Sequence, residues 1–198
     1  VGSLPKYFDK EKYDVRVMLP KYMCMKDEWK EKLQYHTHFY MDLNWRKQYV
    51  GVLEMEYDGI KFYFIDNEYY FNGYAPYGDM YADIEKFAFF SKAVLSALPL
   101  IDFRPDIIHC HDWQTGLGPV YLDNFRYGNE FYRGIKTVMT IHNLKFQGTW
   151  DPKRVRDITG LPQYYFAPDK LEAYKDANYL KGGIVYADRV TTVSYTHL

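Results

Sequence analysis

The residues best suited to chemistry in this sequence stand at the ends of two apolar, strand-like runs. The first run ends in His109-Cys-His-Asp112, and the second ends in His142-Asn143. Carboxylate, imidazole and amide groups together donate and accept several hydrogen bonds, which suits orienting a polyhydroxylated ring. Because the carboxyl ends of neighbouring parallel strands share one crevice, we expect Asp112, His142 and Asn143 to form a single polar site.

Each of these residues also has a plain structural interpretation. Asp112 stands where a strand ends and a helix is about to begin, so its carboxylate could cap the helix or a turn instead. A lone histidine at a strand end is more often structural than catalytic, but the neighbouring Asn143 and Gln147-Gly148 favour a functional role for His142. Tyr77 lies in a loop and is equally compatible with ordinary packing.

The run His109-Cys-His-Asp112 also suggests a metal site, because all four residue types can bind metal ions. Successive side chains of a strand point to opposite faces, so Cys110 should point away from both histidines. We therefore expect no metal ion here, and a structural role for His109 and Cys110.

Two glycine-containing stretches could suggest phosphate binding. Gly116-Leu-Gly118 is an isolated G-x-G, which is weak evidence for a dinucleotide site. Lys181-Gly-Gly-Ile184 is similar to a phosphate loop, but its position favours the first turn of a helix. The sequence contains no Walker A loop and no Gly-x-Ser-x-Gly elbow, and no cofactor is expected.

The segments around these residues alternate between strand-like and helix-like patterns. Apolar residues at every second position predict strands, and apolar residues at helical spacing predict helices. Asp58-Gly59 between two strands indicates a hairpin, and Asp79 is a plausible helix N-cap. The pattern predicts an α/β fold with a mainly parallel sheet, although segment 21–47 gives no clear element. The predicted strands are 14–20, 50–56, 60–65, 106–111, 136–141 and 189–193. The predicted helices are about 80–98, 116–125 and 180–186, and 152–160 is expected to be helical or irregular.

The composition narrows the class of protein. Lys and Arg number 25 against 26 Asp and Glu, which gives no electrostatic case for binding nucleic acid or an anionic membrane. No apolar stretch reaches the roughly 18 residues that a membrane span requires. Cys24 and Cys110 do not suggest a disulfide framework, so a reducing cytoplasm is favoured. The 22 tyrosines suit sugar binding, but their scatter is equally typical of compositional bias.

Taken together, several segments resemble the N-terminal catalytic domain of bacterial glycogen synthase and plant starch synthase. Each motif alone is modest, but their order along almost the whole chain is highly specific. The segments that carry the resemblance are Val1-Gly-Ser-Leu-Pro-Lys6, Ala75-Pro-Tyr77, His109-Cys-His-Asp-Trp-Gln114, Thr140-Ile-His-Asn-Leu-Lys-Phe-Gln-Gly148, Leu180-Lys-Gly-Gly-Ile184 and Ala187-Asp-Arg-Val-Thr-Thr-Val-Ser194.

The resemblance implies a retaining glycosyltransferase that moves glucose from ADP-glucose to the non-reducing end of an α-1,4-glucan. It implies Asp112 and His142 as catalytic residues and Tyr77 and Asn143 as substrate-binding residues. Asp112 and Tyr77 would lie near the acceptor or the transferred glucose, His142 against the transferred sugar, and Asn143 at its hydroxyls. Because a nucleotide sugar carries its own diphosphate leaving group, the task would be positioning and electrostatic stabilisation of an oxocarbenium-like state. No covalent role is assigned to Asp112.

The resemblance also implies a domain organisation. Residues 1–198 would be a partial N-terminal, acceptor-side domain of a two-domain GT-B enzyme, with a Rossmann-like sheet and helices on both faces. The family's Lys-x-Gly-Gly-Leu donor loop and first strand would precede Val1, and its nucleotide-binding C-terminal domain is absent from the sequence. The family's Ser-Pro-Thr-Tyr appears here as Ser194-Tyr-Thr-His197. We therefore expect the 198 residues alone to be inactive.

Two other functions remain open from the sequence. One is another two-domain glycosyltransferase that uses a different nucleotide sugar, such as a sucrose-type synthase. The other is a non-catalytic glucan-binding or assembly module, which the abundance of tyrosine would suit. The partners that the resemblance implies are an ADP-glucose donor, an α-1,4-glucan acceptor and the missing C-terminal domain of the same chain, with no nucleic acid and no membrane.

Overall fold

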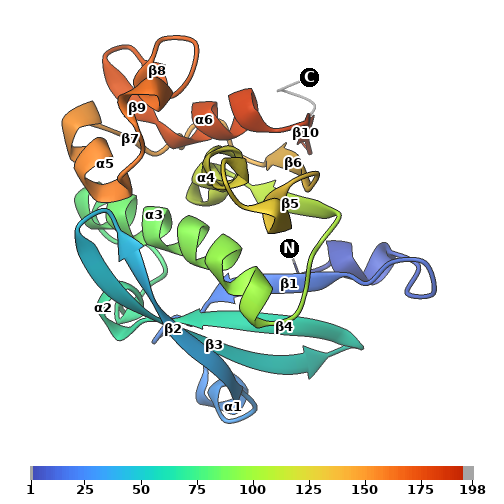
Figure 1. Cartoon of the computed structure of the whole chain (residues 1–198). Helices are drawn as coiled ribbons and strands as arrows, with labels where there is room; N and C mark the ends of the chain where they lie inside the picture. Colours follow the sequence, from blue (N-terminus) through green and yellow to red (C-terminus); the bar gives the residue numbers. More distant parts are fainter. Residues whose placement is uncertain (1, 194–198) are drawn as a thin grey trace. The chain divides into compact units, whose positions relative to one another are not determined.

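The computed structural model describes residues 2–193, and the chain divides into two compact units (Figure 1). The first unit comprises Val1–Met41 and Gln48–Gly78, and the second comprises Asp42–Lys47 and Asp79–Leu198. The expectation for Ser194-Tyr-Thr-His197 lies outside the described residues. Among residues 2–193, every helix is too short or too polar to cross a membrane.

The first unit is built on a four-stranded sheet with the strand order β1-β4-β3-β2. β1 pairs parallel with β4, whereas β3 pairs antiparallel with β4, so this sheet is mixed and not mainly parallel as the sequence pattern predicts. The predicted hairpin is confirmed, with Asp58 and Gly59 at φ values of 52° and 69° in the turn between β3 and β4. The strands are β1 (Arg16–Pro20), β2 (Gln34–Leu43), β3 (Arg46–Tyr57) and β4 (Ile60–Asp66).

Strand β2 is the main element that the sequence pattern does not predict. Most of its side chains are exposed or half-buried, and only Met41 and Leu43 are buried. Apolar alternation marks a strand only when one face is buried, so this strand gives little sequence signal. The short helices of this unit are η1 (Leu4–Tyr7), α1 (Asp27–Lys30) and α2 (Glu68–Phe71).

The second unit contains a three-stranded parallel sheet with the order β10-β6-β5, in agreement with the parallel sheet that the sequence pattern predicts. A smaller antiparallel sheet with the order β7-β9-β8 follows it. The parallel strands are β5 (Ile107–His111), β6 (Lys136–Ile141) and β10 (Arg189–Thr192), and the others are β7 (Thr149–Trp150), β8 (Glu172–Ala173) and β9 (Asp176–Asn178).

The three predicted helices of the second unit are present, and the stretch 152–160, expected to be helical or irregular, is helical. Asp79 caps α3, because its Oδ1 accepts hydrogen bonds from the backbone N–H groups of Tyr81 at 2.7 Å and Ala82 at 3.3 Å. The helices are α3 (Met80–Ala97), α4 (Leu117–Arg126), α5 (Pro152–Thr159) and α6 (Tyr179–Tyr186), with the 3₁₀ turns η2 (Leu98–Leu100), η3 (Trp113–Thr115), η4 (Glu130–Tyr132) and η5 (Gln163–Phe166).

Close packing explains both glycine-containing stretches. A Cβ on Gly116 would lie 2.2 Å from the carbonyl oxygen of Tyr179, so the start of α4 can approach α6 only with glycine at this position. Lys181-Gly-Gly-Ile184 lies inside α6 and is helical, as predicted. These glycines therefore serve helix packing.

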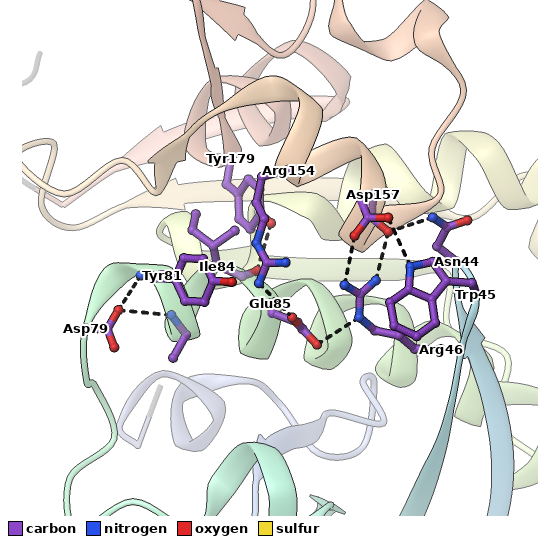
Figure 2. Close-up of polar contacts among 11 residues, drawn as sticks. Asn44, Trp45, Arg46, Asp79, Tyr81, Ile84, Glu85, Arg154, Asp157 and Tyr179 are labelled. Carbon is purple, nitrogen blue, oxygen red and sulfur yellow. Dashed lines mark hydrogen bonds and ion pairs between the residues drawn. The ribbon is translucent and has the colours of Figure 1, made fainter.

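Residues 42–47 form the turn between β2 and β3 together with the strand residues next to it. A polar network connects this segment to α3 and α5 (Figure 2). Arg46 forms ion pairs with Asp157 at 2.9 Å and Glu85 at 3.3 Å. Glu85 also pairs with Arg154 at 3.3 Å, and the Arg154 guanidinium lies 4.3 Å from the ring centre of Tyr81. One carboxylate of α3 thus joins the turn to α5.

Candidate active site at the ends of β5 and β6

The site is positioned by the register of two adjacent parallel strands. His111 of β5 pairs with Thr140 of β6, and the next residue, Asp112, donates its backbone N–H to the carbonyl oxygen of Thr140 at 3.0 Å. The ladder therefore continues to the end of both strands. Asp112 and His142 emerge at the same edge of the sheet, as the parallel-strand argument predicts.

The Asp112 carboxylate binds directly to the segment that follows β6. Its Oδ1 accepts hydrogen bonds from the backbone N–H groups of His142 at 2.7 Å and Asn143 at 3.2 Å. Among the described residues, no hydrogen bond reaches Oδ2 of this carboxylate. Asp112 therefore joins the two strand ends through one oxygen and leaves the other available for a ligand.

The backbone of Asp112 has an unusual conformation. Its φ of 57° and ψ of −175° lie in a region that residues other than glycine seldom adopt. Strain of this kind costs about 1–3 kcal/mol, and it persists only where surrounding contacts enforce it. Here the hydrogen bonds to His142 and Asn143 supply that enforcement, and strained residues of this type cluster at functional sites.

A second contact between the strand ends joins two imidazole rings. Nδ1 of His111 lies 3.0 Å from Nε2 of His142. The ring of His109 stacks on the ring of His111 with a centroid distance of 4.2 Å, and its Nε2 lies 2.6 Å from Oγ1 of Thr140. Burial, followed by the nearby His109 and His142, lowers the pKa of His111 to about 4, so His111 is neutral at neutral pH.

His111 is a member of this contact that the motif pattern by itself does not single out. The sequence does contain a sign of its role, which is the two-residue spacing of His109 and His111. This spacing places both side chains on the same face of a strand, next to His142 at the end of the neighbouring strand. Cys110 points the other way, as predicted, since its Sγ lies 3.0 Å from where a Cβ on Gly118 would be. Burial raises the pKa of the Cys110 thiol to about 12, in keeping with a structural role.

The loop that carries His142 and Asn143 is held by its own polar contacts. Oδ1 of Asn143 accepts a hydrogen bond from the backbone N–H of Lys145 at 3.0 Å. Oε1 of Gln147 accepts one from Nδ2 of Asn178 at 2.7 Å, which ties the loop to the start of α6. These contacts fix residues 142–148 before any ligand binds, which reduces the entropy cost of binding.

Gly148 allows this loop to pack tightly. Its φ is 65°, and a Cβ on it would lie 2.2 Å from the Trp113 indole. Trp113 itself is 4% exposed and packs edge-on against Phe87 with a centroid distance of 5.2 Å. Trp113 is therefore part of the core of the second unit.

The remaining predicted site residue, Tyr77, belongs to the first unit. It lies in the segment between α2 and α3, and 58% of its surface is exposed. Its role in binding stays a prediction. The structure brings together Asp112, His142 and Asn143, which all lie in the second unit.

Metal binding has no support in the described part of the chain. Among residues 2–193, no group of three or more His, Cys, Asp and Glu side chains has the geometry to hold a metal ion. What the cluster offers is a carboxylate oxygen, two linked imidazoles and fixed backbone donors. Such an arrangement can orient hydroxyl groups and stabilise developing positive charge.

Comparison with known proteins relates this arrangement to a family. Residues 1–198 match the family model described as the starch synthase catalytic domain. The chain is 69% identical over 197 residues to a glycogen synthase from Lachnoclostridium phytofermentans, covering 100% of this chain and 41% of that protein. It is 71% identical over 196 residues to a glycogen synthase from Lachnospira eligens, covering 99% and 41%. The chain thus spans about two fifths of the length of these relatives.

The fold has a counterpart among solved structures. The catalytic domain of starch synthase IV from Arabidopsis thaliana, bound to ADP and acarbose, matches with a TM-score of 0.79 and 26% sequence identity. The match covers 94% of this chain and 39% of that chain. The motif order, the strand-end cluster of Asp112, His142 and Asn143, and the family match over residues 1–198 all agree. The chain belongs to the starch synthase catalytic domain family.

Proposed function

We propose that the protein containing this chain is a retaining glycosyltransferase that transfers glucose from ADP-glucose to the non-reducing end of an α-1,4-glucan. Residues 1–198 would form part of the N-terminal, acceptor-side domain of a two-domain GT-B enzyme, with a Rossmann-like sheet covered by helices on both faces. The observation that carries the proposal is the convergence of Asp112, His142 and Asn143 at adjoining strand ends in a chain of this family.

Each residue of the cluster has a task in the proposed reaction. His142 lies against the transferred glucose, Asn143 holds its hydroxyl groups, and Asp112 and Tyr77 lie near the acceptor or the transferred glucose. The bond from the anomeric carbon to the diphosphate oxygen breaks, the acceptor hydroxyl oxygen bonds to that carbon, and its proton passes to the departing diphosphate. A carboxylate and fixed dipoles beside the ring stabilise the positive charge that develops as the diphosphate leaves.

The donor and the setting are part of the proposal. ADP-glucose is favoured because the Arabidopsis starch synthase IV domain was determined with ADP and acarbose bound. We place the protein in a reducing cytoplasm, since Cys24 is an exposed free thiol and Cys110 a buried one. Its partners are then the donor, the glucan and the remaining domain of the same protein.

The isolated chain is proposed to be inactive. It spans about two fifths of the glycogen synthases it matches. The resemblance implies that the family's second domain supplies most contacts to the nucleotide. The strand-end cluster of 112, 142 and 143 would form only one wall of the catalytic cleft. Full activity therefore requires the rest of the protein.

A non-catalytic glucan-binding role has one observation in its favour. Tyr35 and Tyr40 on β2 expose 61% and 62% of their surface, and exposed aromatic rings can stack on sugars. This alternative requires glucan binding without glucose transfer by the full-length protein. Transfer of glucose from a donor other than ADP-glucose would instead favour a different glycosyltransferase.

The deciding experiment measures glucose incorporation into glycogen by the full-length protein with ADP-glucose and UDP-glucose as donors. We expect transfer from ADP-glucose, loss of at least about a hundredfold in kcat for Asp112→Ala, and no turnover by residues 1–198 alone. Normal transfer by Asp112→Ala would refute the role of the cluster. Turnover by the isolated chain would refute the proposal that it is only part of the cleft.

A further inference from the structure

His111 lies beside the strand-end cluster, with its ring between those of His109 and His142. Its Nδ1 is 3.0 Å from Nε2 of His142, and the two ring planes are inclined by 39° with their centres 5.2 Å apart. This distance is that of a direct N–H···N hydrogen bond. His111 is thus the side chain through which β5 contacts the ring of His142.

A hydrogen bond between two neutral imidazoles contains a single proton. One ring must donate from its nitrogen, and the other must accept on a nitrogen that carries no proton. The tautomers of His111 and His142 are therefore linked, and Nε2 of His142 is occupied by this contact. Nδ1 is then the nitrogen of His142 that can face a bound sugar.

His111 is held firmly enough to act in this way. Its backbone N–H donates to Oγ1 of Thr115 at 2.6 Å, and that hydroxyl donates to the carbonyl oxygen of His111 at 2.8 Å. Its ring stacks on His109, whose Nε2 is bonded to Thr140. Oγ1 of Thr140 lies 2.7 Å from Oγ1 of Thr191, so the support extends across all three parallel strands.

His142 has less support of its own. Its side chain is exposed, and Asp112 restrains its backbone but not its ring. An unsupported imidazole can turn about its Cβ–Cγ bond, and a half-turn exchanges the positions of its nitrogens with those of its ring carbons. A catalytic group needs to be held within a narrow range of orientation, because misplacement by about 1 Å can cost a hundredfold in rate.

We propose that His111 is a positioning residue for His142, fixing its ring orientation and tautomer so that Nδ1 of His142 faces the transferred sugar. The identity of the ligand rests on the proposed function, whereas the link between the two rings rests on their geometry. His111 touches no substrate in this proposal and acts only through His142.

Two substitutions separate the hydrogen bond from the shape of the ring. His111→Phe keeps a planar ring that can stack on His109 but removes the nitrogen that faces His142. His111→Asn places an amide close to the position of Nδ1 and so can restore the contact. His38→Phe on the exposed face of β2 in the first unit is the matched control.

The readouts are steady-state kinetics of the full-length protein and ¹⁵N NMR of its histidine rings. We expect His111→Phe to lower kcat about 10- to 100-fold and to change KM for ADP-glucose less than about threefold, because positioning acts on the transition state. We expect His142 to show one neutral tautomer in the parent and a mixture in His111→Phe. His111→Asn should recover at least half of the loss in log kcat. His38→Phe should have the same kcat and KM as the parent.

The outcomes are distinguishable. Parent-like kcat and an unchanged His142 tautomer in a folded His111→Phe protein would overturn the inference. If the parent transfers no glucose, the proposed function fails, while the ¹⁵N pattern of His142 still decides the link between the rings. If His111→Phe does not fold, His111→Gln replaces it, because its longer amide cannot reach the Nδ1 position, and it should lose kcat where His111→Asn retains it.

Discussion

Oδ1 of Asp112 lies 2.7 Å from the backbone nitrogen of His142, so the carboxylate and the histidine are joined although 30 residues separate them in the sequence. The contact uses the main chain of His142 and leaves its ring to His111. Asp112 consequently has two separable tasks, which are to hold the strand ends together and to present negative charge to a ligand. Different substitutions can test these tasks independently.

Asp112→Asn retains an oxygen that can accept the two backbone hydrogen bonds, but it removes the charge. We expect local stability to fall by less than about 1 kcal/mol, because the acceptor oxygen is retained and the backbone strain is common to both proteins. Asp112→Ala leaves both donors without their partner and should cost about 1–3 kcal/mol. Hydrogen–deuterium exchange at the amides of 142 and 143 in the full-length protein measures the local effect.

If charge matters for catalysis, both substitutions at Asp112 should lower kcat by at least about a hundredfold, although only Asp112→Ala raises amide exchange. An Asp112→Asn protein with parent-like kcat would show that the carboxylate serves the strand ends alone. The two measurements together therefore separate the capping role from the catalytic one.

Gly148→Ala tests the packing of the loop that carries His142. The added Cβ would lie 2.2 Å from the Trp113 indole, at a φ of 65°. We expect a loss of about 2–4 kcal/mol or failure to fold, from backbone strain and overpacking together. Gly128→Ala is the matched control, since Gly128 has a φ of 88° but no atom within 4 Å of the added Cβ. It should cost only about 1 kcal/mol, and equal losses in thermal or urea unfolding would contradict the packing argument.

The titration of His111 predicts a dependence of local stability on pH. Its pKa is about 4 in the folded chain, mainly because of burial, against 6.5 for an unperturbed histidine. Between these values the unfolded chain binds a proton that the folded chain does not, so stability falls as pH decreases below 6.5. The full difference corresponds to about 3 kcal/mol, and partial exposure of the ring reduces it to about 1–2 kcal/mol.

Comparison with His111→Phe isolates this effect, because phenylalanine does not titrate. Hydrogen exchange of the β5 and β6 amides, corrected for intrinsic exchange rates, measures the local free energy of unfolding in both proteins. The advantage of the parent over His111→Phe in this free energy should shrink by about 1–2 kcal/mol from pH 7 to pH 4. His109 and His142 face His111 and are present in both proteins, so the comparison reports on the removal of the His111 imidazole and its coupling to them. An advantage that stays constant or grows at low pH would contradict the prediction.

Asp157→Ala tests the attachment of residues 42–47 that Figure 2 shows. The Asp157 carboxylate pairs with Arg46 at 2.9 Å and accepts a hydrogen bond from the Trp45 indole N–H at 3.1 Å. These contacts lower the pKa of Asp157, but its side chain is 47% exposed. We therefore expect a modest cost of about 1 kcal/mol and faster amide exchange confined to residues 42–47. Asp169→Ala, whose carboxylate is 78% exposed, is the control, and equal exchange in both proteins would contradict the prediction.

The sequence by itself determined the elements whose apolar pattern has a regular period. Strands β5 and β6 and helices α3 and α4 are buried on one side or throughout, and burial is what imposes the period of 2 or 3.6. The meeting of Asp112 and His142 also followed, because adjoining parallel strands end at one edge. Motif order alone was sufficient to indicate the family.

Only the tertiary structure decided how the site residues touch one another. The contact of His111 with His142 depends on the register of β5 against β6 and on ring orientation, which no local pattern encodes. The same holds for Asp112, whose carboxylate could cap a helix or bridge the strands until the backbone positions were known. Strand β2 was missed because its largely exposed surface removes the apolar alternation that would reveal a strand. Contacts between residues far apart in the chain are set by packing, and packing is a property of the folded whole.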